Sequence, residues 1–308
     1  MALVYLLYLG MLAWLAWHRM GQLWPALVVP ASAFVVGTLV RKLIDRPRPY
    51  TALGFTPLFP KDKTGQSMPS RHCFSAAAIA AAVLIAGQVV DKPGCVLGLA
   101  TGSTPLPIYR ELIAMSHRGV LDFSKVTTYN LDEYVGLGPD HPCSYRRFMQ
   151  ENLFSQINLP ADHIHIPNGL AEDKDEECHN YDAAIAAAGQ IDLQLLGLGA
   201  NGHIGFNEPA AHFTTNSYCV KLSEQTLHDN RRFFDKNAVM PTHALTMGIA
   251  SIMQAQHIVL VATGLGKADA VRRMIEGPVD PMVPASILQM HRHATILLDA
   301  DAASQLKK

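Results

Sequence analysis

The stretch LGLGANGHIGFNEP, residues 196–209, brings an amide, an imidazole and a carboxylate together on a glycine-rich segment. His203 supplies an imidazole, a group that can both take and give a proton. Glu208 can orient that imidazole and raise its basicity, and Asn201 can assist by hydrogen bonding. No Ser or Cys stands among these residues as a nucleophile. The stretch therefore predicts proton transfer rather than covalent catalysis.

A second pair of acids, Asp132 and Glu133, directly follows the apolar run 125–131. A carboxylate that is partly removed from water can work as a general base. An acid pair in this position can instead cap a following helix. The sequence leaves both interpretations open.

A phosphate could bind in the segment ATGSTPLPIY, residues 100–109. Gly102, Ser103 and Thr104 lie just before a helix whose start is marked by Thr104-Pro105. The backbone N–H groups and hydroxyls of such a turn suit an anion. No Gly-Lys-Ser/Thr follows, so this is not a nucleotide triphosphate loop. An ordinary helix cap is the alternative.

Two basic positions could add to a phosphate site. Lys267 begins an expected helix, where a cation is unfavourable unless an anion lies near it. Arg231 and Arg232 are adjacent, and we expect one of the two to be an ordinary solvated side chain.

These residues follow short apolar runs that alternate with amphipathic ones, which predicts an α/β fold. It is a Rossmann-like, mostly parallel sheet with helices on both faces. Ligands bind such sheets at the carboxyl ends of the strands, so the candidate residues should share one edge. The expected strands are 94–100, 125–131, 163–166, 191–198, 257–263 and 294–298. The expected helices are 104–117, 144–155, 173–188, 223–235, 242–254 and 266–275.

The first ninety residues differ from the rest in charge and hydropathy. Residues 1–90 hold eight Lys and Arg against two acids, whereas residues 91–308 hold seventeen against twenty-four. We therefore expect two domains, a hydrophobic, α-helical, membrane-like segment (1–90) and an α/β domain (91–308). The five cysteines show no CxxC spacing, which argues against a metal site and a disulfide framework.

Three uncharged runs lie in that first segment. The runs 2–17 and 20–40 approach the length of a membrane-spanning helix and carry aromatic residues near an end. The run 73–90 is alanine-rich and suits a membrane helix and a helix packed inside a globular domain equally well.

Residues 41–50 (RKLIDRPRPY) and 67–72 (SMPSRH) resemble the first two motifs of the PAP2 family of membrane phosphatases. The family's third motif, which supplies its nucleophilic histidine, has no match after residue 90. The segment therefore resembles a truncated phosphatase, and we expect no hydrolysis from it.

The rest of the chain resembles glucosamine-6-phosphate deaminases. Seven stretches carry the resemblance in family order, and they are 97–105, 130–137, 144–149, 199–209, 231–235, 244–252 and 277–291. The resemblance implies an enzyme that converts D-glucosamine 6-phosphate and water to fructose 6-phosphate and ammonia in amino-sugar (N-acetylglucosamine) catabolism. It implies no metal and no organic cofactor.

The resemblance also implies roles for the candidate residues. His203, oriented by Glu208 and assisted by Asn201, would open the sugar ring, and Asp132 would move the C2 proton to C1. Glu133 would shape the loop. The 6-phosphate would be held by Gly102, Ser103, Thr104, Arg232 and Lys267.

Two departures from the family accompany this resemblance. Some members have Asp where this chain has Asn201. The family also begins with a strand and a helix before 97–105. Residues 74–92 could replace that helix, but no candidate for the strand is present, which predicts an open sheet edge.

Other functions remain open at this point. They are a 6-phosphogluconolactonase-like hydrolase, a membrane phosphatase, a non-catalytic sugar-phosphate binder tethered to a membrane, and a fusion in which residues 1–90 have no role. As partners we expect a small sugar phosphate, membrane association through residues 1–90 and no nucleic acid, with a homo-oligomer left open. We expect the catalytic domain in the cytoplasm, anchored to the membrane if residues 1–90 insert.

Overall fold

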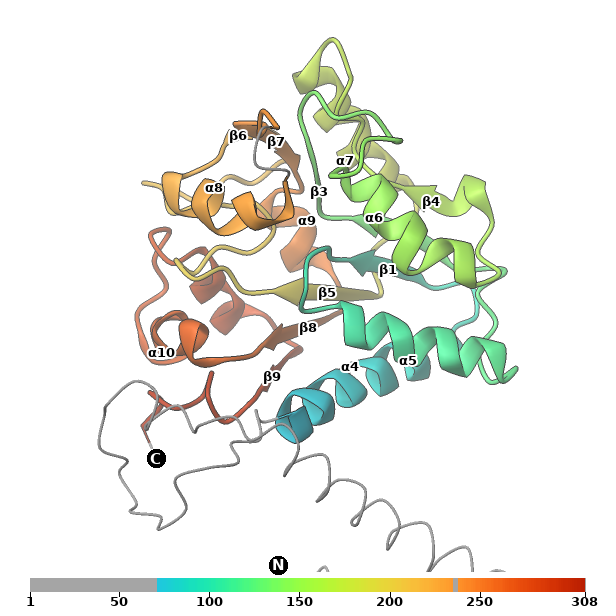
Figure 1. The fold of residues 1–308 in the computed structure, drawn as a ribbon, viewed down its shortest axis with the longest axis horizontal. Coiled ribbons are helices and arrows are strands. Elements are labelled where there is room, and N and C mark those ends of the chain that lie inside the picture. Colours follow the sequence, from blue (N-terminus) through green and yellow to red (C-terminus); the bar gives the residue numbers. More distant parts are fainter. Residues whose placement is uncertain (1–70, 235–237, 308) are drawn as a thin grey trace, which may run out of the picture. The chain divides into compact units, whose positions relative to one another are not determined.

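The structure is a computed structural model, and it describes residues 71–234 and 238–307. Its centre is a six-stranded sheet in the order β4-β2-β1-β5-β8-β9, and neighbouring strands of this sheet are parallel (Figure 1). The six expected strands are confirmed within a few residues. Their bounds are β1 Val96–Leu99, β2 Thr127–Asn130, β4 Ile164–His165, β5 Leu193–Gly197, β8 His257–Ala262 and β9 Ala294–Leu298.

Helices surround this sheet (Figure 1). The central strands are buried along almost their whole length, as in parallel sheets that helices cover. The α-helices are α4 Arg71–Asp91, α5 Leu106–His117, α6 Tyr145–Asn152, α7 Lys174–Ala187, α8 Glu224–Asn230, α9 Ile249–Gln254 and α10 Ala268–Glu276. The short 3₁₀ helices are η1 Phe154–Gln156, η2 Ala161–His163, η3 Arg231–Phe233, η4 Leu265–Lys267 and η5 Pro284–Met290.

A second, three-stranded antiparallel sheet was not predicted. It consists of β3 Asp132–Tyr134, β7 His243–Thr246 and β6 Tyr218–Lys221, in that order. The helix expected over 242–254 is wrong in its first part because residues 243–246 pair with both neighbouring strands. Gly248 then separates β7 from α9, and a side chain there would meet the carbonyl oxygen of Thr215 at 2.2 Å.

The third apolar run forms α4, which packs into the α/β body. One face of this helix is buried in the main hydrophobic core, through Ala77, Ala78, Ala81, Ala82, Ile85 and Val89. Just after the helix, Lys92 Nζ lies 2.8 Å from a carboxylate oxygen of Asp192, at the start of β5. Of the two interpretations of this run, the packed helix is the one that the structure shows.

Within the described residues, no helix has both the length and the apolar character needed to cross a bilayer. The runs 2–17 and 20–40 and the first PAP2-like motif lie outside the described residues, as does most of the second motif. A PAP2-like fusion therefore has no support in the described structure, and the cytoplasmic location stays a prediction. Among the described strands, β4 and β9 form the two edges of the main sheet.

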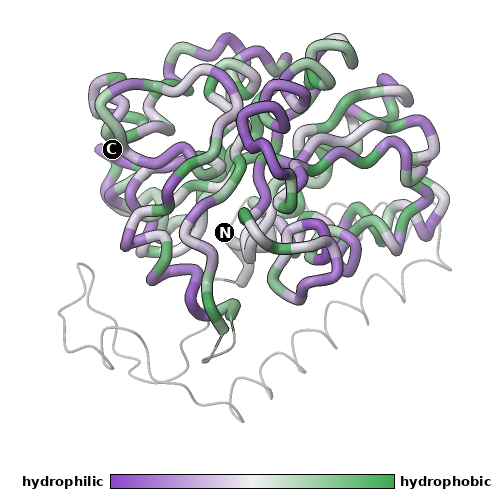
Figure 2. The backbone as a smooth tube through the Cα atoms, turned by 90° about the horizontal axis from the view of Figure 1, so that it is seen from above, coloured by the Kyte–Doolittle hydropathy of each residue, from purple (hydrophilic) through white to green (hydrophobic). Residues whose placement is uncertain are grey.

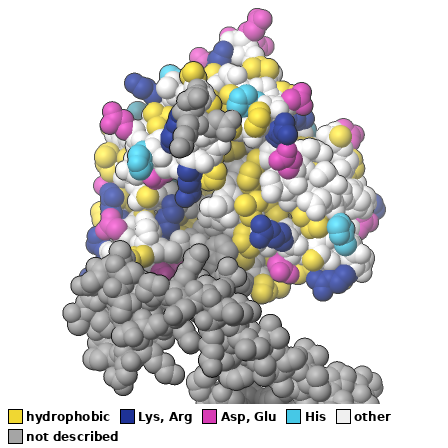
Figure 3. All heavy atoms as spheres, in the orientation of Figure 1, with side chains coloured by type: hydrophobic (Ala, Val, Ile, Leu, Met, Phe, Trp, Pro, Cys, Tyr) yellow, Lys and Arg dark blue, Asp and Glu magenta, His cyan; other side chains and the backbone are white. Residues whose placement is uncertain are grey.

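The described part of the chain shows a mixed surface. Along the backbone, hydrophobic stretches alternate with hydrophilic ones (Figure 2). On the face drawn in Figure 3, Lys and Arg lie among Asp, Glu and hydrophobic side chains. No single sign of charge dominates the described part of this face.

Candidate functional site

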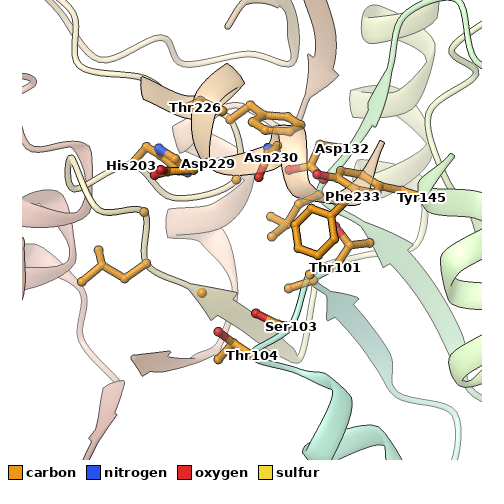
Figure 4. Close-up of a pocket in the computed structure, with 18 of the residues that line it drawn as sticks. Thr101, Ser103, Thr104, Asp132, Tyr145, His203, Thr226, Asp229, Asn230 and Phe233 are labelled. Carbon is orange, nitrogen blue, oxygen red and sulfur yellow. The ribbon is translucent and has the colours of Figure 1, made fainter. Parts of the chain in front are cut away.

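A cavity of about 570 Å³ opens at the carboxyl ends of the central strands (Figure 4). The loops after β1, β2, β5 and β8 all contribute to it, which is the placement expected for a parallel sheet. It is lined by seven of the predicted residues, namely Gly102, Ser103, Thr104, Asp132, His203, Arg232 and Lys267. Asn201 and Glu208 lie behind His203, where Asn201 is hydrogen-bonded to the imidazole and Glu208 to Asn201.

Asp132 is the buried carboxyl group of this cavity, and it begins β3 directly after the end of β2. The backbone just before it is fixed, since Leu131 N–H donates to the carbonyl oxygen of Leu99 and the Leu131 carbonyl accepts from the N–H of Met247. The side chain is 6% exposed, and no described group donates a hydrogen bond to it. Burial, with a smaller contribution from the neighbouring Glu133 carboxylate, raises the pKa of Asp132 to about 8.

Glu133 points away from the cavity and caps α6. Its carboxylate accepts backbone N–H groups from Tyr134 at 2.8 Å, Tyr145 at 2.9 Å and Arg146 at 2.9 Å. The two interpretations of the acid pair therefore apply to one residue each. Glu133 is a helix-capping acid that fixes the loop, and Asp132 is the group that faces the cavity.

The imidazole of His203 is held through Asn201. His203 Nδ1 lies 2.7 Å from Asn201 Oδ1, and Asn201 Nδ2 donates to Glu208 Oε2 at 2.8 Å. An amide oxygen only accepts, so Nδ1 carries the proton and Nε2 is left as the basic nitrogen. The direct distance from Nδ1 to Glu208 Oε2 is 3.7 Å, which is an ion-pair distance rather than a hydrogen bond. The sequence had predicted Glu208 as the direct partner, but Asn201 stands between the two.

Glu208 is surrounded by hydrogen-bond donors. Its Oε1 accepts the hydroxyl of Ser223 at 3.1 Å and the backbone N–H of the same residue at 3.3 Å. Burial by itself would raise the pKa of Glu208, but His203, Thr226 and Asn201 outweigh it and lower the pKa to about 2. This carboxyl group is therefore ionised throughout the physiological range.

The other end of the cavity is suited to an anion. Gly102 adopts φ +96°, a left-handed conformation that favours glycine, and turns the chain so that Ser103 and Thr104 line the cavity. Lys267 immediately precedes α10, and burial and the nearby Arg232 lower its pKa despite the opposing effect of Asp229. A half-buried lysine beside an arginine is stabilised when an anion binds between them.

The two adjacent arginines have different surroundings, and neither is simply a solvated side chain. Arg231 donates to the carbonyl oxygen of Ala238 at 2.8 Å, away from the cavity. Arg232 lines the cavity, and its guanidinium lies 4.8 Å from the centre of the Phe233 ring.

An aromatic wall of the cavity was missed in the sequence. Tyr145 and Tyr134 are joined through their hydroxyls at 3.3 Å, and Asn230 donates to Tyr134 at 3.1 Å. Both tyrosines lie in stretches that carried the family resemblance, but their spacing alone indicated no role.

Within the described residues, no group of three His, Cys, Asp or Glu side chains could hold a metal ion.

Comparison with known proteins shows the family to which this fold belongs. The model of the family "Glucosamine-6-phosphate isomerases/6-phosphogluconolactonase" matches residues 70–297. The chain belongs to this family. The match begins next to α4, the helix that packs into the core. It does not begin at the boundary between the two expected domains, after residue 90.

Its relatives are close in sequence. The chain is 52% identical over 224 residues to a glucosamine-6-phosphate deaminase of Thermoanaerobacter sp. (strain X514), covering 73% of this chain and 88% of the relative. It is 53% identical over 228 residues to glucosamine-6-phosphate deaminase 2 of Bacillus subtilis (strain 168), covering 73% and 92%.

Solved structures agree with the fold. A monomeric glucosamine-6-phosphate deaminase superposes with a TM-score of 0.74 at 42% identity, over 76% of this chain and 97% of that one. The 6-phosphogluconolactonase of Thermotoga maritima superposes with a TM-score of 0.60 at 18% identity, over 73% and 94%. The second likeness is one of fold alone.

Proposed function

We propose that this protein is a glucosamine-6-phosphate deaminase, which converts D-glucosamine 6-phosphate and water to fructose 6-phosphate and ammonia. The observation that carries the proposal is that one cavity contains two different groups able to transfer protons, a carboxyl group and an imidazole. Among the residues that the structure describes, Asp132 is a buried carboxyl group with no hydrogen-bond donor, and Nε2 of His203 has no hydrogen-bond partner. The identity of about 50% to deaminases supports the same activity.

The anion-binding end fixes the substrate. Ser103 and Thr104, with the turn at Gly102, would hold the 6-phosphate together with Arg232 and Lys267. Anchoring the phosphate places C1 and C2 of the sugar at a set distance from the proton-transfer groups. Positioning of this kind lowers a barrier by up to several kcal/mol.

His203 would open the sugar ring. Its Nε2 takes the proton from the C1 hydroxyl, and the imidazolium returns this proton to the ring oxygen as the bond between C1 and the ring oxygen breaks. Asn201 fixes the orientation of the imidazole ring. The ionised Glu208 behind Asn201 stabilises the transient imidazolium.

Asp132 would then transfer a proton from C2 to C1. Its raised pKa suits this task, because a base with a pKa near the working pH both takes and returns a proton readily. The enolamine intermediate becomes a ketimine when C1 is protonated, and water then releases ammonia and leaves the ketose. These steps use only groups of this chain and a water molecule.

The test is an assay of the full chain with glucosamine 6-phosphate. We expect ammonia and fructose 6-phosphate in equal amounts. The matched substrate is 6-phosphogluconolactone, because its hydrolysis releases acid and no ammonia. Lactone hydrolysis without ammonia release from the amino sugar would contradict the proposal.

A further inference from the structure

Ser223 lies where the proton-transfer part of the cavity meets the segment that carries Arg232. Its hydroxyl and its backbone N–H both point to Glu208 Oε1, at 3.1 Å and 3.3 Å. It is also the N-cap of α8, since its oxygen accepts the N–H of Thr226 at 3.2 Å. One side chain therefore joins the carboxylate of Glu208 to the first turn of α8.

The two ends of this connection reach opposite parts of the cavity. On one side, the second oxygen of Glu208 accepts from Asn201, which in turn holds the imidazole of His203. On the other side, α8 ends at residue 230 and continues directly into η3, which contains Arg232. The hydrogen bonds of Ser223 are thus a link between the imidazole and the anion-binding guanidinium.

Capping of α8 alone does not explain the arrangement. An N-cap needs only an oxygen that accepts a backbone N–H from the first turn. Ser223 also gives its own hydrogen to Glu208, and the carboxylate is a stronger acceptor than the hydroxyl of Thr226, 3.1 Å away. The hydroxyl oxygen of Ser223 therefore accepts a hydrogen bond from the first turn of α8, and the hydroxyl hydrogen is donated to the Glu208 carboxylate.

We infer that Ser223 is a positioning residue that fixes the position of the His203 imidazole relative to the segment that carries Arg232. It acts through Glu208 on one side and through α8 on the other. The inference rests on the proposed function for what His203 and Arg232 do, and it adds a residue that the sequence did not indicate.

Three substitutions separate the two roles of the hydroxyl. Ser223→Ala removes both the cap and the donor, and Ser223→Thr keeps both. Ser223→Asp keeps a good N-cap but places a second negative charge against Glu208. The matched control is Ser217→Ala, because Ser217 donates to Asp182 in the same way, through its hydroxyl at 2.6 Å and its N–H at 2.8 Å. Ser217 does not line the cavity.

Two measurements on the full chain are needed, with thermal unfolding recorded for every variant. The first is steady-state ammonia release, with kcat and KM determined separately. The second is the Kd of inorganic phosphate by titration calorimetry. We expect Ser223→Ala to lower kcat and to weaken phosphate binding by about tenfold each, which is the size of effect of losing one hydrogen bond to a charged group. Ser223→Thr should restore both, and Ser223→Asp should restore neither.

Several outcomes would overturn the inference. One is a Ser223→Ala variant whose kcat and phosphate Kd stay within twofold of the unmodified protein. Another is a Ser223→Asp variant with normal values, which would reduce the role to helix capping. A third is a Ser217→Ala variant that loses as much of either quantity as Ser223→Ala, at equal thermal stability.

Failure of the proposed function would give a different result from failure of the inference about Ser223. In that case the unmodified chain would release no ammonia from glucosamine 6-phosphate. The phosphate titration would still compare the Ser223 variants with the Ser217 control, so the inference would remain open to test.

Discussion

Two carboxyl groups near one cavity, Asp132 in its lining and Glu208 behind His203, have opposite environments. Asp132 follows β2 and has no hydrogen-bond donor among the described residues, and its pKa is raised to about 8. Glu208 lies in the loop after β5 and accepts from Asn201 and Ser223, and its pKa is lowered to about 2. Both side chains are largely removed from water. Burial is thus common to both, and the number of donors separates them.

This difference suits two different tasks. A carboxyl group with a pKa near neutrality can exchange a proton during a reaction, whereas one with a pKa near 2 stays charged and acts as a fixed negative pole. In the proposed deamination, Asp132 transfers the proton and Glu208 stabilises a positive imidazole through Asn201. Variants that remove or alter one carboxyl group at a time test this division.

Asp132→Asn should have the largest effect on turnover. The amide cannot take the C2 proton, so we expect kcat for ammonia release to fall by about 10²–10⁴-fold. The same change should stabilise the fold at high pH. The folded protein holds a proton on Asp132 up to about pH 8, whereas the unfolded chain loses it near pH 4. Stability is therefore intact at low pH and falls as the pH rises between these values.

Thermal unfolding of Asp132→Asn at pH 9 and pH 4 checks this sign. The variant should melt above the unmodified protein at pH 9, by roughly 2–4 °C for each kcal/mol recovered, and match it at pH 4. Full turnover with Asn at this position would refute the role of Asp132 as the base.

Glu208→Gln should have the next largest effect and the opposite pH dependence. The imidazolium loses its negative pole, so we expect kcat to fall by roughly 10²-fold. A lowered pKa means that the ionised Glu208 stabilises the fold above about pH 4, and this contribution is lost as the pH falls toward 2. The variant should therefore melt lower than the unmodified protein at pH 7, with the gap closing in acid. If both carboxyl variants showed the same pH trend, the contrast between the two groups would be wrong.

The general position of the site could be predicted from the sequence, because the candidate residues other than Arg232 lie in segments that follow an apolar strand. In a parallel sheet, the ends of successive strands share one edge, so Gly102, Asp132 and His203 had to meet. The hydrogen-bond order around the imidazole could not be predicted. Asn201 stands between His203 and Glu208 because the turn 199–203 brings the amide and the ring together, and sequence spacing does not determine that geometry.

The second sheet shows the same limit for the fold. Residues 243–246 carry an apolar pattern compatible with a helix, and only their pairing with β3 and β6 makes them a strand. Ser223 was missed for a related reason. A serine before a short helix is an ordinary cap, and its second partner lies fifteen residues earlier in the chain. The alanine-rich run 73–90 was ambiguous because its composition suits a bilayer and a protein core alike.

Glu133→Gln should change the pH profile more than the maximal rate. The negative charge beside Asp132 contributes to the raised pKa, so its removal should lower that pKa. The acidic limb of kcat/KM, which reports groups of the free enzyme, should then move to lower pH. Glu177→Gln is the control, because Glu177 also accepts a backbone N–H, from Asn168 at 2.8 Å, outside the cavity. A profile that shifts equally in both variants would point to loss of a cap rather than to charge.

Lys92→Met should affect turnover least. Asp192 is another buried carboxylate, with 1% of its side chain exposed, and it accepts from Lys92 and from the N–H of Val96. Methionine fills similar space without a donor, so Asp192 would lose one of its two partners and the free energy of unfolding would fall by about 1–3 kcal/mol. This carboxylate lies outside the cavity, and kcat should be unchanged at temperatures where the variant is folded. Denaturant unfolding beside ammonia release measures both quantities. A loss of kcat in folded Lys92→Met would mean that α4 and the start of β5 influence the site, and the sharp difference between structural and catalytic carboxylates would then fail.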